Sequence, residues 1–318
     1  MRSLEAIDGL LLLVMVIWGG NFSVVKAALA EVSPQAFNSL RLLLATGLFL
    51  AVLQLSRRSG RHGVLGRLGL HETLAHSPAL TIREWLAVAA LGTVGHLLYQ
   101  LCFVGGLERT TAANSALIVG SNPVIVALLS AVLGLERIGR LHWIGTGLSM
   151  VGIYLVVGRS SEISGASLPG DLLMLGAVGC WAIYTVGSRP LLVRHSPLVV
   201  TAYSMAFGTV GYVATSWRAL RDPAWLAMSG SAWASLVFSA VFALFVAYLV
   251  WYAAIQRLGS AGTSIYANLV PVTGVAFAVL WLGEPLELVT VLGAGAIVCG
   301  VALTKVGGRG AADPPAEE

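Results

Sequence analysis

Long apolar stretches, separated by short polar connections, set the pattern of this chain from its beginning nearly to its end. Each is close to the roughly 20 residues that an α-helix needs to cross the hydrocarbon core of a bilayer. The ten stretches cover Ile7–Ala27, Gln35–Leu55, Arg83–Gly105, Thr110–Leu133, Leu141–Gly158, Asp171–Ser188, Leu198–Trp217, Ser231–Ala254, Thr263–Leu282 and Leu288–Lys305. They are apolar on nearly every side, whereas the strands of a membrane barrel alternate. The pattern predicts an all-α membrane protein with ten transmembrane helices.

The composition agrees with a chain whose solvent is the membrane. Apolar residues make up 57% of the 318 positions and charged residues 11%, against about 25% charged in an average soluble domain. The net charge of +4 is not gathered into a basic patch interleaved with aromatic residues, which argues against a nucleic-acid partner. Cys102, Cys180 and Cys299 lie in apolar runs without a CxxC pair. They predict packing residues, with no disulfide framework and no metal site.

Two segments fall outside the apolar pattern. The loop at about Ser56–Ile82 is basic, and the spacings of its histidines, His62, His71 and His76, do not match a metal-ligand set. We expect a basic loop next to the membrane. Residues 307–318 lack apolar content, which predicts a disordered cytoplasmic tail.

The distribution of basic residues predicts the orientation in the membrane. Ten spans place both termini on one side, and 13 of the 19 Lys and Arg residues fall on that side while five fall on the other. By the positive-inside rule, both termini lie in the cytoplasm. We expect a multi-pass protein of the plasma membrane, which is the inner membrane of a bacterium.

The two halves of the chain can be laid over each other with two offsets. A shift of 163 residues pairs Trp18 with Trp181, Lys26 with Arg189, and Ser33-Pro34 with Ser196-Pro197. A shift of 148 residues pairs Arg109 with Arg257, Pro123 with Pro271, Glu136 with Glu284, and Gly145, Gly147 and Gly152 with Gly293, Gly295 and Gly300. Landmarks that keep their order under only two offsets indicate a duplication.

Each repeat contains five predicted helices, so the second must enter the membrane from the opposite face. The result is an inverted repeat about a pseudo-two-fold axis in the membrane plane, with residues 1–158 as the first unit and 159–306 as the second. Secondary transporters commonly use this plan, because a site between the two halves can open to either side in turn.

Several motifs resemble the EamA-type branch of the drug/metabolite transporter superfamily. They are IWGGNF at Ile17–Phe22, the single arginine of the second span (Arg41), SNP at Ser121–Pro123 with VP at Val270–Pro271, and LGEP at Leu282–Pro285. The resemblance covers roughly residues 7–305. It implies that helices 1–4 and 6–9 enclose a central cavity and that helices 5 and 10 lie outside it. Members that resemble this chain export amino acids, including aromatic ones, and related metabolites. In the first unit LGEP becomes LERI (Leu135–Ile138), so the two gates need not behave alike.

Polar and aromatic residues within the spans predict the lining of that cavity, because lipid offers a polar group no partner. In the third span, for example, four such residues from His96 to Phe103 follow the spacing of one α-helical face. The predicted lining residues are Trp18, Asn21, Phe22, Arg41, His96, Tyr99, Gln100, Phe103, Asn114, Trp181, Tyr184, Tyr248, Trp251, Tyr252 and Tyr266. The alternative interpretation is ordinary aromatic packing between helices.

Charges and prolines add candidates for binding and gating. Arg41 is the one strong charge well inside a span; it either binds a substrate carboxylate or gates the cavity, or it caps carbonyl groups of neighbouring helices. Pro123 and Pro271 each remove a backbone hydrogen bond and kink a helix, which either makes a hinge or only shapes the bundle. Together with Lys26 and Glu284 they are the predicted hinge and gate residues.

The spans lack a deep carboxylate, which argues against a permanently cationic drug as the main substrate. His96 is the one deep group that titrates near neutral pH, so proton antiport and facilitated diffusion both stay open. We expect a secondary transporter that exports amino acids or related small metabolites, works without a cofactor, and is a monomer or weak dimer. Drug, nucleoside or nucleotide-sugar transport is the alternative within the fold, and a channel or receptor is the alternative outside it. HExxH, GxSxG and P-loop motifs are missing from the sequence, which disfavours an enzyme.

Overall fold

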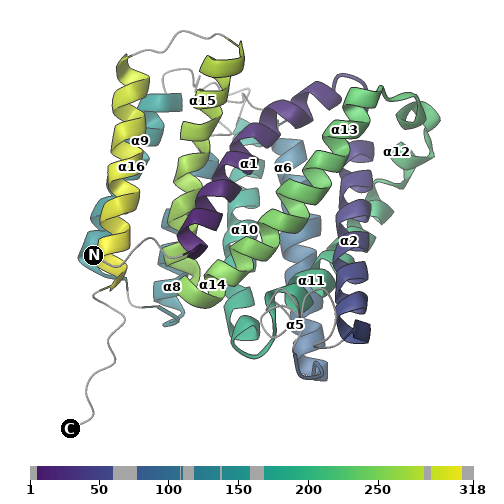
Figure 1. The fold of residues 1–318 in the computed structure, drawn as a ribbon, viewed down its shortest axis with the longest axis horizontal. Helices are drawn as coiled ribbons and strands as arrows, with labels where there is room; N and C mark the ends of the chain where they lie inside the picture. Colours follow the sequence, from purple (N-terminus) through teal and green to yellow (C-terminus); the bar gives the residue numbers. More distant parts are fainter. Residues whose placement is uncertain are drawn as a thin grey trace.

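The computed structural model describes residues 6–59, 77–107, 109, 118–136, 138–157, 168–282 and 288–309. The regular secondary structure of these residues is helical. Six of the helices are long and apolar enough to cross a membrane, and two shorter apolar helices accompany them. The chain is therefore an all-helical membrane protein with several membrane-spanning helices, arranged as Figure 1 shows.

The helices follow most of the predicted stretches. Those of the first half are α1 (Ala6–Ala28), α2 (Pro34–Ser59), α5 (Ile82–Gly92), η2 (Thr93–Leu98), α6 (Tyr99–Leu107), α8 (Asn122–Val132) and α9 (Arg140–Val157). Those of the second half are α10 (Leu168–Arg194), α11 (Pro197–Thr215), α12 (Trp217–Arg221), η4 (Pro223–Ala227), α13 (Gly230–Phe238), η5 (Ser239–Val246), α14 (Ala247–Ser264), η6 (Ile265–Asn268), α15 (Leu269–Leu282) and α16 (Leu288–Arg309). The helix α10 is longer than its predicted stretch, because it continues through Pro190. Most of the predicted basic loop and most of the predicted tail lie outside the described residues.

The alternation of helix directions defines two faces of the bundle. We call the face at which α1 begins and α16 ends the terminal face, and the face at which α1 ends and α16 begins the opposite face. The terminal face is at the bottom of Figure 1. Polar N-caps start helices at both faces: Ser196 caps α11 at the terminal face, and Ser229 caps α13 at the opposite face.

Two π-helices interrupt the long rods, and they occupy corresponding places. The segment η2 joins α5 to α6, and η5 joins α13 to α14. A shift of 148 residues carries residues 93–98 onto 241–246, which lie inside η5. The prediction of one α-helical face from His96 to Phe103 is wrong in its geometry, because His96 lies in a π-helical turn and Phe103 in the following α-helix. Such turns are rare and are often found at functional sites.

Backbone irregularities also accompany the two predicted hinge prolines. A turn at Ser121 precedes α8, and Pro123 lies in the first turn of that helix. The 3₁₀ turn η6 precedes α15, and Pro271 lies near the start of α15. A proline in a first turn loses no helical hydrogen bond. The bends therefore lie just before the prolines, and a role of these residues as hinges stays a prediction.

The helices α9 and α16 pack closely along one edge of the bundle (Figure 1). Glycines make this approach possible, since a Cβ on Gly152 would lie 2.6 Å from the carbonyl oxygen of Gly293. A Cβ on Gly145 would likewise clash with the carbonyl oxygen of Gly300. Between these contacts the Ser149 hydroxyl donates to the Ile297 carbonyl at 3.3 Å. The small residues let the two backbones meet.

Some residues contact the very residue with which the two offsets pair them. The rings of Trp18 and Trp181 lie 6.1 Å apart between centroids. The hydroxyls of Thr46 and Thr209 form a 2.8 Å hydrogen bond across a separation of 163 residues. Ser149 and Ile297 are separated by 148 residues. These contacts join the first half of the chain to the second.

Candidate functional site

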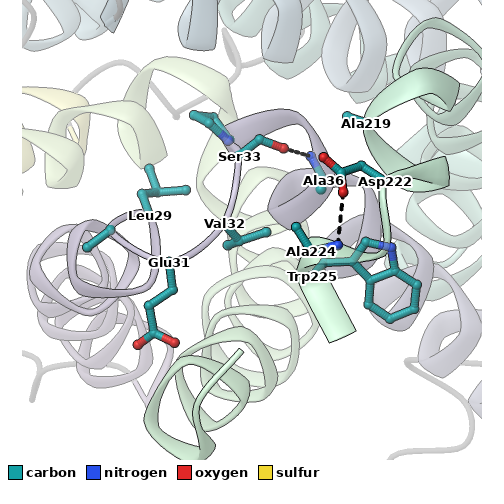
Figure 2. A pocket seen from close by; sticks show the side chains of 11 residues that line it. Leu29, Glu31, Val32, Ser33, Ala36, Ala219, Asp222, Ala224 and Trp225 are labelled. Atoms are coloured by element: carbon teal, nitrogen blue, oxygen red, sulfur yellow. Dashed lines mark hydrogen bonds between the residues drawn. The ribbon is translucent and has the colours of Figure 1, made fainter. Parts of the chain in front are cut away.

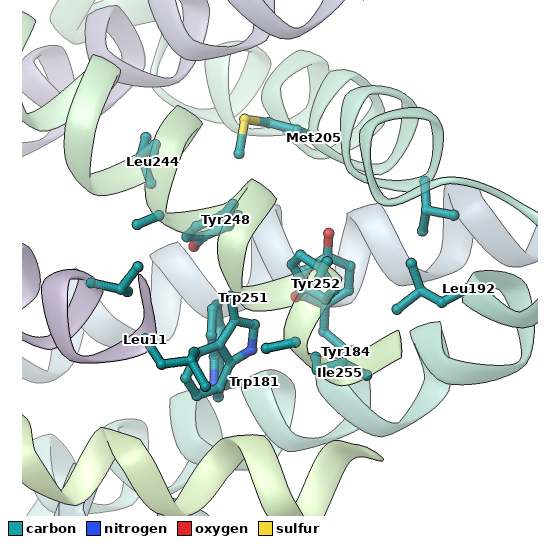
Figure 3. Packing of buried hydrophobic residues seen from close by; sticks show 14 of the residues in the cluster. Leu11, Trp181, Tyr184, Leu192, Met205, Leu244, Tyr248, Trp251, Tyr252 and Ile255 are labelled. Carbon is teal, nitrogen blue, oxygen red and sulfur yellow. The ribbon is translucent and has the colours of Figure 1, made fainter. Parts of the chain in front are cut away.

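A cluster of aromatic side chains fills the middle of the bundle, where α1, α6, α10 and α14 meet. We define the aromatic cluster as Trp18, Tyr99, Trp181, Tyr184, Tyr248, Trp251 and Tyr252, which are joined by ring contacts with centroid separations of 5.1 to 6.4 Å. Trp181 touches Trp18, Tyr99, Tyr248 and Trp251 at once. Figure 3 shows Tyr248, Trp251 and Trp181 gathered between their helices. Most of the contacts are edge-on or tilted, the arrangement that aromatic quadrupoles favour.

The π-helix η5 takes part in this cluster through its backbone. The indole nitrogen of Trp18 donates to the carbonyl oxygen of Ala243, which lies in η5, at 2.9 Å. This bond ties α1, from the first half of the chain, to the eighth predicted span. A buried indole N–H needs such a partner, and the bond fixes the orientation of the Trp18 ring.

A chain of three buried polar groups lies on the terminal side of the cluster. The Nε2 atom of His96 lies 3.0 Å from the Tyr184 hydroxyl, and that hydroxyl lies 2.7 Å from the hydroxyl of Ser204. All three residues are fully buried. Glycines bring the helices close here: a Cβ on Gly92 would clash with the Ser204 carbonyl, and a Cβ on Gly208 would clash with His96. The helices are therefore tightly packed on this side of the cluster.

Arg41 lies on α2, next to the cluster, and is half-buried. Its Nη1 donates to the Ser239 hydroxyl at 3.2 Å, and the described residues give it no carboxylate partner. The phenol groups of Tyr248 and Tyr99 lie within electrostatic range of its charge. One helical turn before it, Asn38 donates to the side-chain oxygen of Gln100 at 3.3 Å. A guanidinium placed among neutral polar and aromatic groups is a favourable partner for an anion.

Several buried polar atoms around the cluster have no hydrogen-bond partner among the described residues. They are Oδ1 of Asn21, Nε of Arg41, Nδ1 of His96, Nε1 of Trp251 and the hydroxyl of Tyr252. Buried polar groups are normally satisfied, so each such atom needs an explanation. A solute or water bound at this place would supply the partners.

The structure brings most of the predicted lining residues together. Besides the cluster itself, His96, Gln100, Phe103 and Arg41 contact or adjoin it. Tyr266 is different, because its hydroxyl donates to Asp8 at 2.6 Å at the terminal face. Asn114 and Glu284, and the side chains of Phe22 and Lys26, lie outside the described residues.

Several polar residues that the structure places here were not predicted from the sequence. Ser239 bonds Arg41, Tyr212 accepts from Asn38, and Ser204 bonds Tyr184. The repeat contained a signal for Ser204, since the shift of 163 residues pairs it with Arg41 and pairs Tyr184 with Asn21. Ser239 and Tyr212 carry no comparable signal.

Two cavities lie away from the cluster. One, of about 360 Å³, is at the opposite face between the α1–α2 turn and the segment from α12 to η4 (Figure 2). Glu31 lines it and accepts hydrogen bonds from the backbone N–H and the hydroxyl of Ser229, which lower the pKa of this carboxyl below its usual value. The other, of about 310 Å³, is apolar and lies between α8 and α10. Neither is lined by the residues predicted to bind solute.

Helices that are long and apolar enough to cross a membrane make this chain an integral membrane protein. The family model that matches the chain is the EamA-like transporter family, over residues 6–158 and 168–306. The chain therefore belongs to the EamA-like transporter family and contains two EamA domains. It is a membrane transporter and not an enzyme.

The chain is also similar in sequence to known transporters and membrane proteins. An uncharacterized transporter of Archaeoglobus fulgidus is 30% identical over 299 residues, which cover 93% of this chain and 96% of the relative. The uncharacterized transporter YyaM of Bacillus subtilis is 27% identical over 292 residues, covering 89% and 88%. The inner membrane protein YtfF of Escherichia coli is 27% identical over 262 residues, covering 75% and 79%. A solved crystal structure has the same fold, with a TM-score of 0.72 and 18% identity over 96% of this chain and 99% of that chain.

Proposed function

We propose that this transporter exports amino acids or related small metabolites across the plasma membrane by alternating access. The observation that carries the proposal is the Arg41 guanidinium, which lies beside the aromatic cluster. It donates to Ser239, and its Nε atom has no hydrogen-bond partner among the described residues. A charge inside a span costs roughly 2.5–3.5 kcal/mol on insertion scales. The carboxylate of a bound amino acid would offset that cost.

The groups around Arg41 suit the ammonium group and the side chain of an amino acid. The aromatic cluster offers ring faces and edges to a nonpolar side chain. Amide oxygens suit an ammonium group, and Oδ1 of Asn21 has no hydrogen-bond partner among the described residues. One cation, unsatisfied acceptors and aromatic walls within a single site favour a zwitterion with an apolar side chain.

Two inverted five-helix repeats, residues 1–158 and 159–306, supply the alternation. The contacts between repeat counterparts support this arrangement: Trp18 meets Trp181, and Thr46 meets Thr209. The glycine contacts between α9 and α16 are likewise reciprocal, since Gly145 meets Gly300 while Gly152 meets Gly293. A site on the axis between two such halves becomes accessible from each side in turn.

The basic residues support an orientation with both termini, and hence the terminal face, in the cytoplasm. The name of the relative YtfF, an inner membrane protein, supports the plasma membrane as the location. Facilitated diffusion and proton antiport remain the two options for energy coupling, and a monomer or weak dimer is the expected assembly.

The proposal is tested by counterflow of radiolabelled amino acids into proteoliposomes that contain the purified protein. Each amino acid is paired with its decarboxylated amine, which keeps the side chain and the ammonium but lacks the group that Arg41 would bind. We expect counterflow of at least one amino acid, and much less of its amine. The Arg41→Gln variant is expected to weaken the apparent affinity for the amino acid about 10- to 100-fold, since a charge-assisted hydrogen bond contributes roughly 1.5–3 kcal/mol.

Arg218→Gln is the matched control, because it removes the same charge from α12 at the opposite face, away from the cluster. No exchange above empty vesicles across the whole panel would overturn the amino-acid assignment. Nucleosides and nucleotide sugars belong in the same panel, since exchange of those solutes alone would favour the alternative transport function. Flux without saturation or trans-stimulation would favour a channel.

A further inference from the structure

Acidic residues of the first EamA domain bind basic residues of the second at the terminal face. The pairs are Asp8 with Lys305 at 2.5 Å, Glu84 with Arg194 at 2.9 Å and with His195 at 3.1 Å, and Glu136 with Arg189 at 3.0 Å. The carboxylate side chains are 3–11% exposed. Because each pair crosses from one domain to the other, any motion that separates the domains at this face must break it.

Glu136 makes the most connected of these contacts. Its Oε1 accepts from the backbone N–H of Ser260 at 2.6 Å, and its Oε2 accepts from that of Ala261 at 3.2 Å. Arg189 pairs with the same carboxylate and also donates to the neighbouring Leu135 carbonyl at 2.5 Å. One side chain in the short connection between α8 and α9 thus holds α10 and the start of the ninth predicted span.

Gly259 explains why the chain presents those N–H groups. Its φ of 81° and ψ of 171° break the helix that precedes it, so Ser260 and Ala261 begin a new helical segment. The first N–H groups of a helix have no partner within it and carry a partial positive charge, which a carboxylate satisfies. A Cβ on Gly259 would lie 2.8 Å from Glu136 Oε2, so the glycine is needed for its conformation and for the close approach of the carboxylate.

The Glu136 contact is connected to the buried polar chain on the terminal side of the aromatic cluster. The Ser260 hydroxyl donates to the carbonyl oxygen of Thr185 at 3.3 Å. Thr185 follows Tyr184, the central member of the buried polar chain, and lies on the same helix as Arg189. Displacing Glu136 therefore breaks the link from Arg189 on α10 to the N–H groups of Ser260 and Ala261, and leaves the hydrogen bond from Ser260 to Thr185 between these segments.

We propose that Glu136 is a positioning residue that locks the terminal face closed, and that its release from Arg189, Ser260 and Ala261 is a required step in opening that face. This inference rests on the alternating-access function proposed above. The inference assigns the opening of the terminal face to the side chain of Glu136, which was not among the predicted gate residues.

The opposite face supplies a matched control. Glu31 also accepts hydrogen bonds from the second domain, from the Ser229 N–H at 2.7 Å and from its hydroxyl at 2.8 Å. Like Glu136, it satisfies the N-terminus of a helix that belongs to the other domain. It lies at the other face of the bundle, so Glu31→Gln removes a similar carboxylate without touching the proposed lock.

The test measures access to a reporter behind the lock. Thr185→Cys is introduced after Cys102, Cys180 and Cys299 have been replaced by alanine; Thr185 is fully buried, and the change is small. Inside-out and right-side-out membrane vesicles are treated with a membrane-impermeant maleimide, and the labelling rate is followed with and without Glu136→Gln. We expect Glu136→Gln to raise labelling from the terminal side at least about fivefold, the lower end of typical coupling between two conformations, and Glu31→Gln to leave it unchanged.

Arg189→Gln is the second variant, and it keeps the carboxylate on the two N–H groups while removing the ion pair. A smaller increase than with Glu136→Gln is expected. Size-exclusion chromatography establishes which variants fold, and a folded Arg189→Gln decides the question if Glu136→Gln does not fold. Unchanged labelling in the folded variants, or an equal increase from both sides, would overturn the lock. The labelling assay needs no solute. Its outcome therefore does not depend on whether the counterflow panel finds a transported amino acid.

Discussion

The two sides of the aromatic cluster use corresponding positions for different chemistry. On the terminal side, Tyr184 and Ser204 bond to each other and to His96, and all three side chains are fully buried. On the opposite side, the counterparts of the first two are Asn21 and Arg41. These are half-buried, and each keeps a polar atom without a hydrogen-bond partner among the described residues. Of the three terminal-side residues, His96 alone keeps such an atom, Nδ1, whereas Asn21 and Arg41 both have atoms left to offer a solute.

In the inverted repeat proposed above, divergence of this kind makes the two faces differ in free energy. If both halves carried the same residues, the closed and open sides would have equal free energy and neither state would be favoured by the protein itself. Here the terminal side has a continuous polar chain and three carboxylates that cross between the domains. We therefore expect the protein without solute to rest with its terminal face closed.

The largest change in stability is expected from a substitution that disturbs the packing on the terminal side of the cluster. Gly92→Ala places a methyl group against the Ser204 backbone carbonyl, which cannot move aside as a flexible side chain would. We expect a loss of about 1–3 kcal/mol in the free energy of unfolding, as for other overpacked cores, measured by denaturation with SDS in mixed micelles.

Gly47→Ala is the control for this substitution, because no heavy atom lies within 4 Å of the added methyl group. We expect no loss from Gly47→Ala, since alanine also favours the helix. Equal losses from both variants would mean that tight packing does not distinguish the terminal side.

A smaller effect is expected from the polar chain. Tyr184→Phe removes the hydroxyl that bonds both His96 and Ser204, leaving buried groups unsatisfied. The expected loss is about 1–2 kcal/mol in the same denaturation assay. Tyr154→Phe, on the lipid-exposed surface of α9, should change little. A Tyr184 variant as stable as the Tyr154 variant would show that the chain does not stabilise the closed side.

The sequence predicts the helices and the pairing of the two halves better than it predicts local backbone geometry. The apolar stretches predicted the helices, since the membrane permits little else, and the offsets paired Trp18 with Trp181, which the structure finds in contact. The π-helices η2 and η5 were missed, because a stretch that is apolar on every side hides the period of its helix. Their placement decides which side chains face the cluster, as at His96.

The polar contacts between distant segments could not be predicted from the sequence either. The offsets had already paired Glu136 with Glu284 and Arg189 with Lys26, but nothing in the pattern brought Glu136 and Arg189 together. Their 3.0 Å contact depends on how α8 and α10 pack, and on a backbone break at Gly259 that no motif announces. Most residues predicted to line the cavity lie close together, because burial alone forces polar and aromatic groups within spans toward the protein interior. That they line a cavity stays a prediction.

Whether the terminal face is closed in the protein without solute is tested by comparing single cysteine reporters on the two sides of the aromatic cluster. Asn21→Cys and Thr185→Cys are placed separately in the background that lacks native cysteines, and the impermeant maleimide is applied from each side of the membrane. We expect the cysteine at position 21 to react from the outer side and the cysteine at position 185 to resist labelling from both sides. Labelling at position 185 from the terminal side as fast as labelling at position 21 from the outer side would contradict this expectation.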